Sequence, residues 1–172
     1  VIALGVDQQF CGFFVIADQL KSDTAQAIAQ LKDMGITPVM VTGDHPLSAH
    51  AIARQAGIDE VIAKVLPQEK GEVVKRFQNE HKVAMVGDGI NDAVALTQAD
   101  VGIAIGSGSD VAVESADIIL MKEGIADVAT AIRLSKAVIR NIHQNLFWAF
   151  FYNSIGIPIA AGVFFPLFQF KL

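Results

Sequence analysis

Several residue types are scarce in this chain of 172 residues, and each scarcity excludes a class of protein. The chain has one cysteine, Cys11, so an internal disulfide is impossible and a reducing compartment is the simplest fit. Basic residues are also few, 13 against 18 acidic ones, and the formal net charge of -5 argues against a nucleic-acid binder, which needs a basic face. Charged residues make up 18% and apolar residues 52%, which excludes a disordered or collagen-like chain and indicates contact with lipid.

Charge is absent from one long stretch near the C-terminus, between Leu146 and Phe168. A bilayer core of about 30 Å needs about 20 mostly apolar residues in a helix, so this stretch predicts one transmembrane helix over 143–168. Aromatic residues at its start and basic residues just before it suit a membrane interface with a cytoplasmic flank. The alternative is a buried hairpin of a soluble protein. Because the chain begins with Val1 and stops shortly after this stretch, we expect it to be a piece of a longer membrane protein.

The rest of the chain alternates between apolar strands and amphipathic helices. Apolar runs of strand length predict strands at 11–17, 36–42, 61–65, 82–87, 101–105 and 117–121. Helical spacing of apolar residues, together with proline and glycine at helix ends, predicts helices at 22–34, 46–56, 67–80, 91–98 and 125–142. Continuous apolar strands separated by helices indicate an α/β fold with a doubly wound parallel sheet covered on both faces.

Two acidic turns lie where a sheet of this kind binds its ligands, outside the carboxyl ends of the strands. The TGD turn, Thr42-Gly43-Asp44, follows the predicted strand 36–42. The GDGIND turn, from Gly87 to Asp92, follows the predicted strand 82–87. Its two glycines let the backbone bend and approach a ligand closely.

The side chains of these turns suit a magnesium-dependent phosphate site. Asp88 and Asp92 place two carboxylates near a helix start, and Mg²⁺ takes one or two carboxylates together with phosphate oxygens. Asn91 and the helix N-terminus can receive an anion. Thr42 offers a hydroxyl and a backbone N–H to a phosphate oxygen, and Lys70 offers a positive charge. A TGD turn alone is common on surfaces and a lone helical lysine is usually solvated, but the set in this order predicts phosphoryl transfer.

Other features of the sequence are interpreted without a functional role. The glycines from Gly102 to Gly108 resemble a nucleotide-binding loop only loosely, so packing or turns are the better interpretation. The four histidines are scattered and are expected at the surface, not in a metal cluster: His45, His50, His81 and His143. Cys11 lies in a predicted strand and is expected in the core.

A set of motifs together resembles the heavy-metal P-type ATPases of the copper-exporting kind, over almost the whole chain: VMVTGD, LPQEK, VAMVGDGINDAVAL, ADVGIAIGSGSDVAVESADIILM and NLFWAFFYNSIGIPIAAG. The resemblance implies a haloacid dehalogenase-like (HAD-like) phosphorylation domain over 11–142, preceded by the end of a nucleotide-binding region or a linker strand over 1–10 and followed by the membrane helix 143–168. It implies ATP and Mg²⁺ as cofactors, copper(I) as the transported ion, and lipid and the rest of the pump as partners. It also implies an integral protein of a bacterial plasma membrane with the α/β domain in the cytoplasm.

The same resemblance assigns roles to individual residues. It implies that Asp88 and Asp92 hold Mg²⁺ and that Tyr152 and Asn153 belong to the copper path. The residues that it places around the phosphoryl group are Thr42, Gly43, Asp44, Lys70 and Asn91. From the residues alone, the polar positions 152–154 interrupt an apolar run, and either face an ion path or hydrogen-bond neighbouring helices.

The chain also departs from the family pattern. No DKTGT motif occurs, so the aspartate that is phosphorylated is expected upstream of Val1, and the chain alone is expected to be inactive. Val94 and Gln19 stand where the family usually has proline, which affects turn rigidity and removes no ligand.

Three alternatives remain. The first is a HAD-family phosphatase, membrane-anchored or soluble, for which Asp7 is the only nucleophile candidate by position, although it lacks a second acid two residues later. The second is a P-type ATPase for zinc or cadmium. The third is a degenerate, membrane-anchored interaction domain, against which the intact set of Asp88, Asn91 and Asp92 argues.

Overall fold

The computed structural model describes residues 2–7, 9–14, 20–87, 90–106, 114–122 and 124–162. The chain divides into two compact units, Val1–Ala129 and Thr130–Leu172. The described strands belong to the first unit, and most of the last helix belongs to the second.

The chain begins with an antiparallel hairpin. Strand β1 (Ile2–Val6) pairs with β2 (Gln9–Phe14), and the register shifts between Leu4 and Gly5. Asp7 in the connection has a φ of 50°, in the left-handed region that tight hairpin turns use. So short a connection permits only antiparallel pairing, so the predicted strand 11–17 is corrected: it starts earlier and is not part of the parallel sheet. Residues 15–17 lie outside the described residues.

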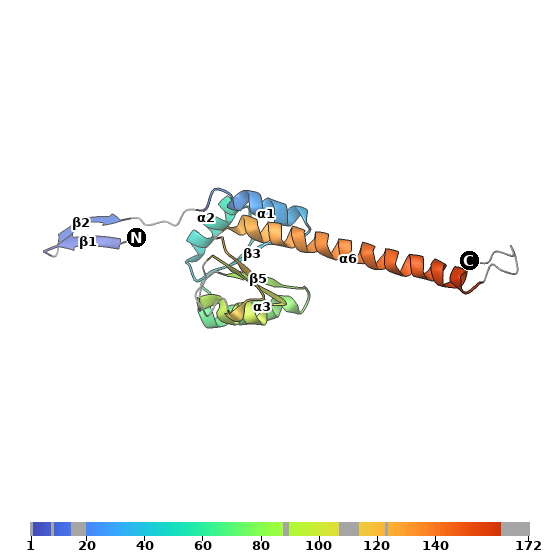
Figure 1. Ribbon diagram of the computed structural model, residues 1–172. Coiled ribbons are helices and arrows are strands. Elements are labelled where there is room, and N and C mark those ends of the chain that lie inside the picture. Colours follow the sequence, from blue (N-terminus) through green and yellow to red (C-terminus); the bar gives the residue numbers. More distant parts are fainter. Residues whose placement is uncertain are drawn as a thin grey trace. The chain divides into compact units, whose positions relative to one another are not determined.

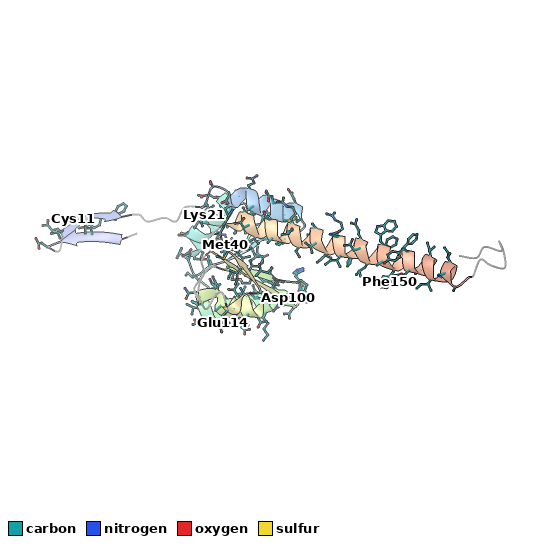
Figure 2. The ribbon with its side chains drawn as sticks, in the orientation of Figure 1. Cys11, Lys21, Met40, Asp100, Glu114 and Phe150 are labelled. Carbon is teal, nitrogen blue, oxygen red and sulfur yellow. The ribbon has the colours of Figure 1, made fainter. Side chains whose placement is uncertain are left out.

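The expectation that Cys11 lies in the core is wrong, because its side chain is exposed (Figure 2). Successive side chains of a strand point to opposite faces. Phe10 on one face of β2 is 70% exposed, and Phe13 on the other face is 64% exposed. Side chains on both faces of β2 are therefore exposed to solvent. A residue in this strand, such as Cys11, is not buried merely because it lies in a strand.

The remaining described strands pair in parallel. They are β3 (Val39–Val41), β4 (Glu60–Ile62), β5 (Ala84–Gly87), β6 (Val101–Ile105) and β7 (Ile118–Leu120). β3 pairs with β4, and β6 pairs with β5 on one side and β7 on the other. The predicted parallel strands are therefore confirmed, in two hydrogen-bonded groups among the described residues.

Helices connect and cover these strands. They are α1 (Thr24–Asp33), α2 (Pro46–Ala56), α3 (Lys70–Gln78) and α4 (Ala93–Gln98), with 3₁₀ turns η1 (Pro67–Glu69) and η2 (Ile90–Asp92). Figure 1 shows β3 and β5 between α1 and α2 on one side and α3 on the other, as a doubly wound α/β fold requires. The buried apolar side chains that form the core come from these elements and include Ile28, Leu31, Ala49, Ala53, Val74, Leu96, Ile103 and Ala104.

Local sequence signals set the ends of α2. His45 precedes the helix, and its Nδ1 accepts a hydrogen bond from the Leu47 N–H at 3.3 Å. Pro46 occupies the first turn, where its missing N–H costs nothing. Gly57 ends the helix with a φ of 78°, a conformation that glycine adopts without strain. The predicted bounds 46–56 are therefore confirmed.

The last helix, α6 (Ile125–Ala160), is continuous through Pro158. It contains the predicted helix 125–142 and most of the predicted membrane segment. Val128 and Ala129 are buried, whereas large apolar side chains farther along are exposed, among them Phe150 at 70% (Figure 2). Among the described residues, which end at position 162, no helix is both long enough and apolar enough to cross a membrane. The rest of the predicted segment, 163–168, lies outside the described residues.

Candidate active site

The TGD turn follows β3 and folds onto the segment after β4. The Thr42 hydroxyl donates to Asp44 Oδ2 at 3.0 Å and accepts a hydrogen bond from the Asp44 N–H at 3.1 Å. The Thr42 N–H donates to the Ile62 carbonyl at 3.0 Å, and the Thr42 carbonyl accepts from the Val65 N–H at 3.1 Å. The Asp44 carbonyl accepts from the Lys64 N–H at 3.1 Å. These bonds hold the Thr42 hydroxyl and the Asp44 carboxylate together at the carboxyl end of β3.

Lys64 takes an unusual backbone conformation beside this turn. Its φ is 58°, in the left-handed region that costs a residue with a side chain about 1–2 kcal/mol. The hydrogen bond from its N–H to the TGD turn compensates for part of this strain. Lys64 was not among the predicted site residues, and the sequence carries no signal for this conformation, since lysine is not enriched in the left-handed region.

Lys70 and Asp92 form a second contact among the predicted site residues. Lys70 is the first residue of α3, after a 3₁₀ turn in which Glu69 Oε2 accepts a hydrogen bond from the Leu66 N–H at 3.0 Å. Its Nζ donates to Asp92 Oδ1 at 2.6 Å. The two side chains are only 15% and 11% exposed, so the charge-assisted bond is largely shielded from water. This contact brings the predicted positive charge and one predicted metal ligand together.

Gly87 allows Asp92 to lie against the end of β5. A Cβ atom at position 87 would lie 2.6 Å from the Asp92 Cβ and 2.8 Å from its Oδ2. Distances this short do not occur between real side chains, so any larger residue at 87 would displace Asp92. The sequence predicts that the backbone at Gly87 approaches a ligand closely; in the structure it is the Asp92 side chain that lies against this backbone, and the approach to a ligand stays a prediction.

Of the other predicted site residues, the structure describes Asn91 and Gly43. Asn91 lies in η2 beside Asp92 and is exposed. Gly43 is exposed, and a Cβ there would make an ordinary contact of 3.4 Å with the Val65 carbonyl. Asp88 lies outside the described residues. The structure thus brings the predicted site residues together in two contacts, Thr42 with Asp44 and Lys70 with Asp92. The TGD turn is hydrogen-bonded to the segment after β4, and Lys70 follows that segment in the sequence.

The donors in the site suit a magnesium ion that is shared with a bound phosphate. In the part of the chain that the structure describes, no three His, Cys, Asp or Glu side chains form a group that could hold a metal. Mg²⁺ does not require such a cage, because it binds one or two carboxylates and completes its shell with phosphate oxygens and water. Asp92 offers a carboxylate for such a shell, and its Oδ1 already accepts a hydrogen bond from Lys70 Nζ. The four histidines are exposed, as predicted.

Tyr152 and Asn153 belong to the second unit, on α6. The Asn153 amide donates through Nδ2 to the Ala149 carbonyl at 2.8 Å, one turn earlier on the same helix. The Tyr152 side chain is 62% exposed. The amide therefore satisfies part of its hydrogen bonding within its own helix.

A second polar cluster lies away from the site, at the amino end of β6. Asp100 accepts hydrogen bonds from Lys82 Nζ at 2.7 Å, the Val83 N–H at 3.0 Å and Gln78 Nε2 at 3.2 Å. The Lys82 bond, followed by the other two, lowers the pKa of Asp100 from 3.8 to about 2. Figure 2 labels Asp100. Because ligands bind at the opposite ends of parallel strands, this cluster serves the fold and not the site.

The sequence matches a known protein family and is similar to several curated proteins. The sequence profile described as haloacid dehalogenase-like hydrolase matches residues 2–100. The chain is 55% identical over 163 residues to copper-transporting ATPase 1 of Rhizobium meliloti, an alignment that covers 94% of this chain and 20% of that protein. It is 52% identical over 167 residues to copper-transporting ATPase 2 of Mus musculus, covering 96% of this chain and 11% of that protein. The chain thus spans about a fifth or less of the length of these curated relatives.

Solved structures show the same fold. One crystal structure of a zinc-transporting PIB-type ATPase superposes with a TM-score of 0.80 at 39% sequence identity. The superposition covers 91% of this chain and 25% of that one. A second crystal structure of a zinc-transporting PIB-type ATPase, in a different state, gives a TM-score of 0.78 at 40% identity and covers 85% of this chain and 24% of that one.

Proposed function

Because the chain belongs to the haloacid dehalogenase-like hydrolases, we propose that it is the phosphoryl-transfer part of an ATP-driven P-type pump that exports copper(I). The observation that carries this proposal is the shielded Lys70–Asp92 pair at 2.6 Å, which lies beyond the carboxyl end of β5. A site there matches the ligand-binding edge of a doubly wound sheet. The high identity to two proteins named as copper-transporting ATPases supports the choice of pump and of ion.

The residues of the site divide the work of phosphoryl transfer, which depends on positioning and on neutralising charge. Thr42 offers its hydroxyl to a phosphoryl oxygen. In the structure the single proton of that hydroxyl is donated to Asp44 Oδ2 at 3.0 Å, so it would turn from Asp44 to the phosphoryl oxygen when the phosphoryl group binds. Lys70 supplies a positive charge to the phosphoryl group, and Asp92 fixes the lysine in place. Asn91, exposed next to Asp92, donates its amide to the same group.

Asp92, together with Asp88, would hold Mg²⁺ in this proposal. The ion supplies further positive charge to the phosphoryl oxygens when it is bound. The proposal places the acceptor aspartate in a longer pump protein of which this chain would be a part, because the sequence contains no DKTGT motif and the chain spans about a fifth or less of the curated relatives. ATP is the phosphoryl donor, and the longer protein supplies the remainder of its binding site.

The C-terminal part of α6 is proposed to lie in the membrane and to contribute to the copper path. In support, many large apolar and aromatic side chains of this part are exposed, including Phe147, Trp148, Phe150 and Phe151. Such a surface is costly in water and suits lipid or neighbouring helices. Polar residues interrupt this stretch at positions 152–154, and the proposal assigns Tyr152 and Asn153 to the ion path.

The membrane-anchored phosphatase is the weaker hypothesis. Asp7, its nucleophile candidate, lies in the turn of an antiparallel hairpin and is exposed. A HAD-like nucleophile must follow a strand of the parallel sheet if it is to face the other turns. A pump for zinc is a closer competitor, because the superposed structures are described as zinc-transporting.

Metal-stimulated ATP hydrolysis tests the proposal. The longer protein would be purified, reconstituted in lipid vesicles and assayed with copper(I), zinc and cadmium, alongside its Asp92→Asn variant. We expect copper(I) to stimulate hydrolysis and the variant to lose about 10²-fold or more of that activity. Stimulation by zinc or cadmium alone would refute the assignment of copper. Full activity of the variant would refute the assignment of the site.

A further inference from the structure

Helix α4 and the turn before it rest on strand positions that have no side chain. Asp92 and Leu96 are four residues apart, so they lie on the same face of this segment. Gly87 of β5 lies under Asp92. Gly102 of β6 lies under Leu96, and a Cβ at position 102 would be 2.7 Å from the Leu96 carbonyl oxygen and 3.1 Å from its carbon. Both contacts are too short for any residue other than glycine.

Neither side of the Gly102 contact can yield easily. The Gly102 N–H donates to Asp117 Oδ2 at 2.8 Å, and the Gly102 carbonyl accepts from the Asp117 N–H at 2.9 Å. Gly102 is also paired with Met85 of β5 in the parallel sheet. Leu96 is 1% exposed, and the atoms that a Cβ would meet belong to its backbone. A side chain at position 102 must therefore shift α4 away from β6.

A third glycine sets the distance between α4 and α3. A Cβ at Gly71 would lie 3.0 Å from Val94 Cγ1, which is closer than ordinary packing. Gly71 directly follows Lys70, and Val94 is two residues after Asp92. The contact between Gly71 and Val94 therefore lies directly beside the ion pair. Val94 is 59% exposed, so this contact is softer than the one at Gly102.

We propose that Gly102 and Gly71 are positioning residues for phosphoryl transfer. By letting α4 lie close to β6 and α3, they set the contact between Lys70 Nζ and Asp92 Oδ1, although neither glycine belongs to the site. The catalytic consequence depends on the function proposed above, whereas the geometric consequence does not.

The main experiment introduces Gly102→Ala into the longer protein. The structure of the variant should show Lys70 Nζ and Asp92 Oδ1 separated beyond about 3.5 Å, the limit of a hydrogen bond. Phosphoenzyme formed from labelled ATP should require about tenfold to a hundredfold more Mg²⁺ for half-maximal labelling, as expected when a catalytic group is misplaced by about 1 Å.

Two controls separate positioning from loss of stability. Gly12→Ala in β2 places its Cβ where no atom lies within 4 Å, so both measurements should match the wild type. Leu31→Ala removes packing from the core at α1, where the side chain is 8% exposed. It should lower thermal stability without changing the Mg²⁺ dependence.

Gly71→Ala is a second test. Its new Cβ comes closest to a side-chain atom, Val94 Cγ1, whereas the Cβ of Gly102→Ala comes closest to backbone atoms of Leu96. Alanine favours helix more than glycine does, so this variant of α3 should fold at least as well as the wild type. It should raise the Mg²⁺ requirement by about twofold to tenfold, less than Gly102→Ala because Val94 can move. Val94→Ala removes the opposing methyl group and should restore the wild-type requirement in the double variant.

The outcomes are distinguishable. A Lys70–Asp92 contact that stays near 2.6 Å in Gly102→Ala, with an unchanged Mg²⁺ requirement, overturns the proposal. Failure of Val94→Ala to rescue Gly71→Ala also counts against it. If the wild-type protein forms no phosphoenzyme but the contact still opens in Gly102→Ala, the positioning role stands and the proposed function fails.

Discussion

Removing the positive charge of Lys70 tests the ion pair at the centre of the site. In Lys70→Met the side chain keeps its aliphatic stem but loses the ammonium group. The Asp92 carboxylate, with its side chain 11% exposed, then loses its cationic partner at 2.6 Å. Lys75 lies on the same helix and is exposed, so Lys75→Met is a matched control.

The expected magnitude follows from the shielding of the pair. A hydrogen bond to a charged group contributes about 1.5–3 kcal/mol, and breaking a fully buried pair costs about 3–5 kcal/mol. Because both side chains keep a little exposure, we expect Lys70→Met to lose about 2–3 kcal/mol of unfolding free energy. In a chain of 172 residues this corresponds to a Tm lower by about 5–10 °C.

Thermal unfolding of the purified chain, followed by circular dichroism, measures this loss. Asp92→Asn in the Lys70→Met background removes the uncompensated charge, so the double variant should be more stable than the sum of the two single losses predicts. The coupling should be about 1–2 kcal/mol. The reasoning is refuted if Lys70→Met unfolds at the same temperature as Lys75→Met, or if the two site substitutions are additive.

Four further predictions concern other parts of the chain. Asp100 has a lowered pKa of about 2, so its contribution to stability is present above about pH 4 and is lost as the pH falls toward 2; Asp100→Asn should flatten acid unfolding in that window. Lys64→Gly relieves a left-handed φ and should raise or maintain the unfolding free energy, whereas Lys64→Val should lower it by about 1–2 kcal/mol in denaturant titrations. Asn153→Ala in the longer protein should lower copper(I)-stimulated ATPase activity but leave phosphorylation by inorganic phosphate intact; a loss of thermal stability alone would indicate helix packing. The chain by itself, incubated with labelled ATP and Mg²⁺, should form no acid-stable, hydroxylamine-sensitive label, and such a label would favour Asp7 as a nucleophile.

Local signals made much of the fold predictable. Pro46 and Gly57 mark the two ends of α2 because their backbone preferences act within one or two residues. The apolar runs of β5 and β6 predict parallel strands, because strands that helices cover on both faces have no regular polar positions. The first hairpin could not be predicted in this way, because the direction in which β2 pairs depends on a two-residue turn whose sequence carries no strong turn signal.

The site was predictable in composition but not in contacts. Thr42 and Asp92 stand out because they lie in acidic turns that follow predicted strands, and Lys70 stands out because it places a positive charge early in the predicted helix 67–80. The direct bond between Lys70 and Asp92 could not be predicted, since it depends on how closely α3 and α4 pack. That distance depends on Gly71 of α3, whose partner Val94 belongs to a different helix and lies farther along the sequence.

The most direct test of the account is phosphorylation of the longer protein by ATP. Labelled ATP and Mg²⁺ should produce an acid-stable phosphoenzyme that hydroxylamine removes, as expected for an aspartyl phosphate. Asp92→Asn and Lys70→Ala should reduce its level by about 10²-fold, while Lys75→Ala should leave it unchanged. Normal phosphoenzyme in both site variants would contradict the claim that the Lys70–Asp92 pair is the centre of a phosphoryl-transfer site.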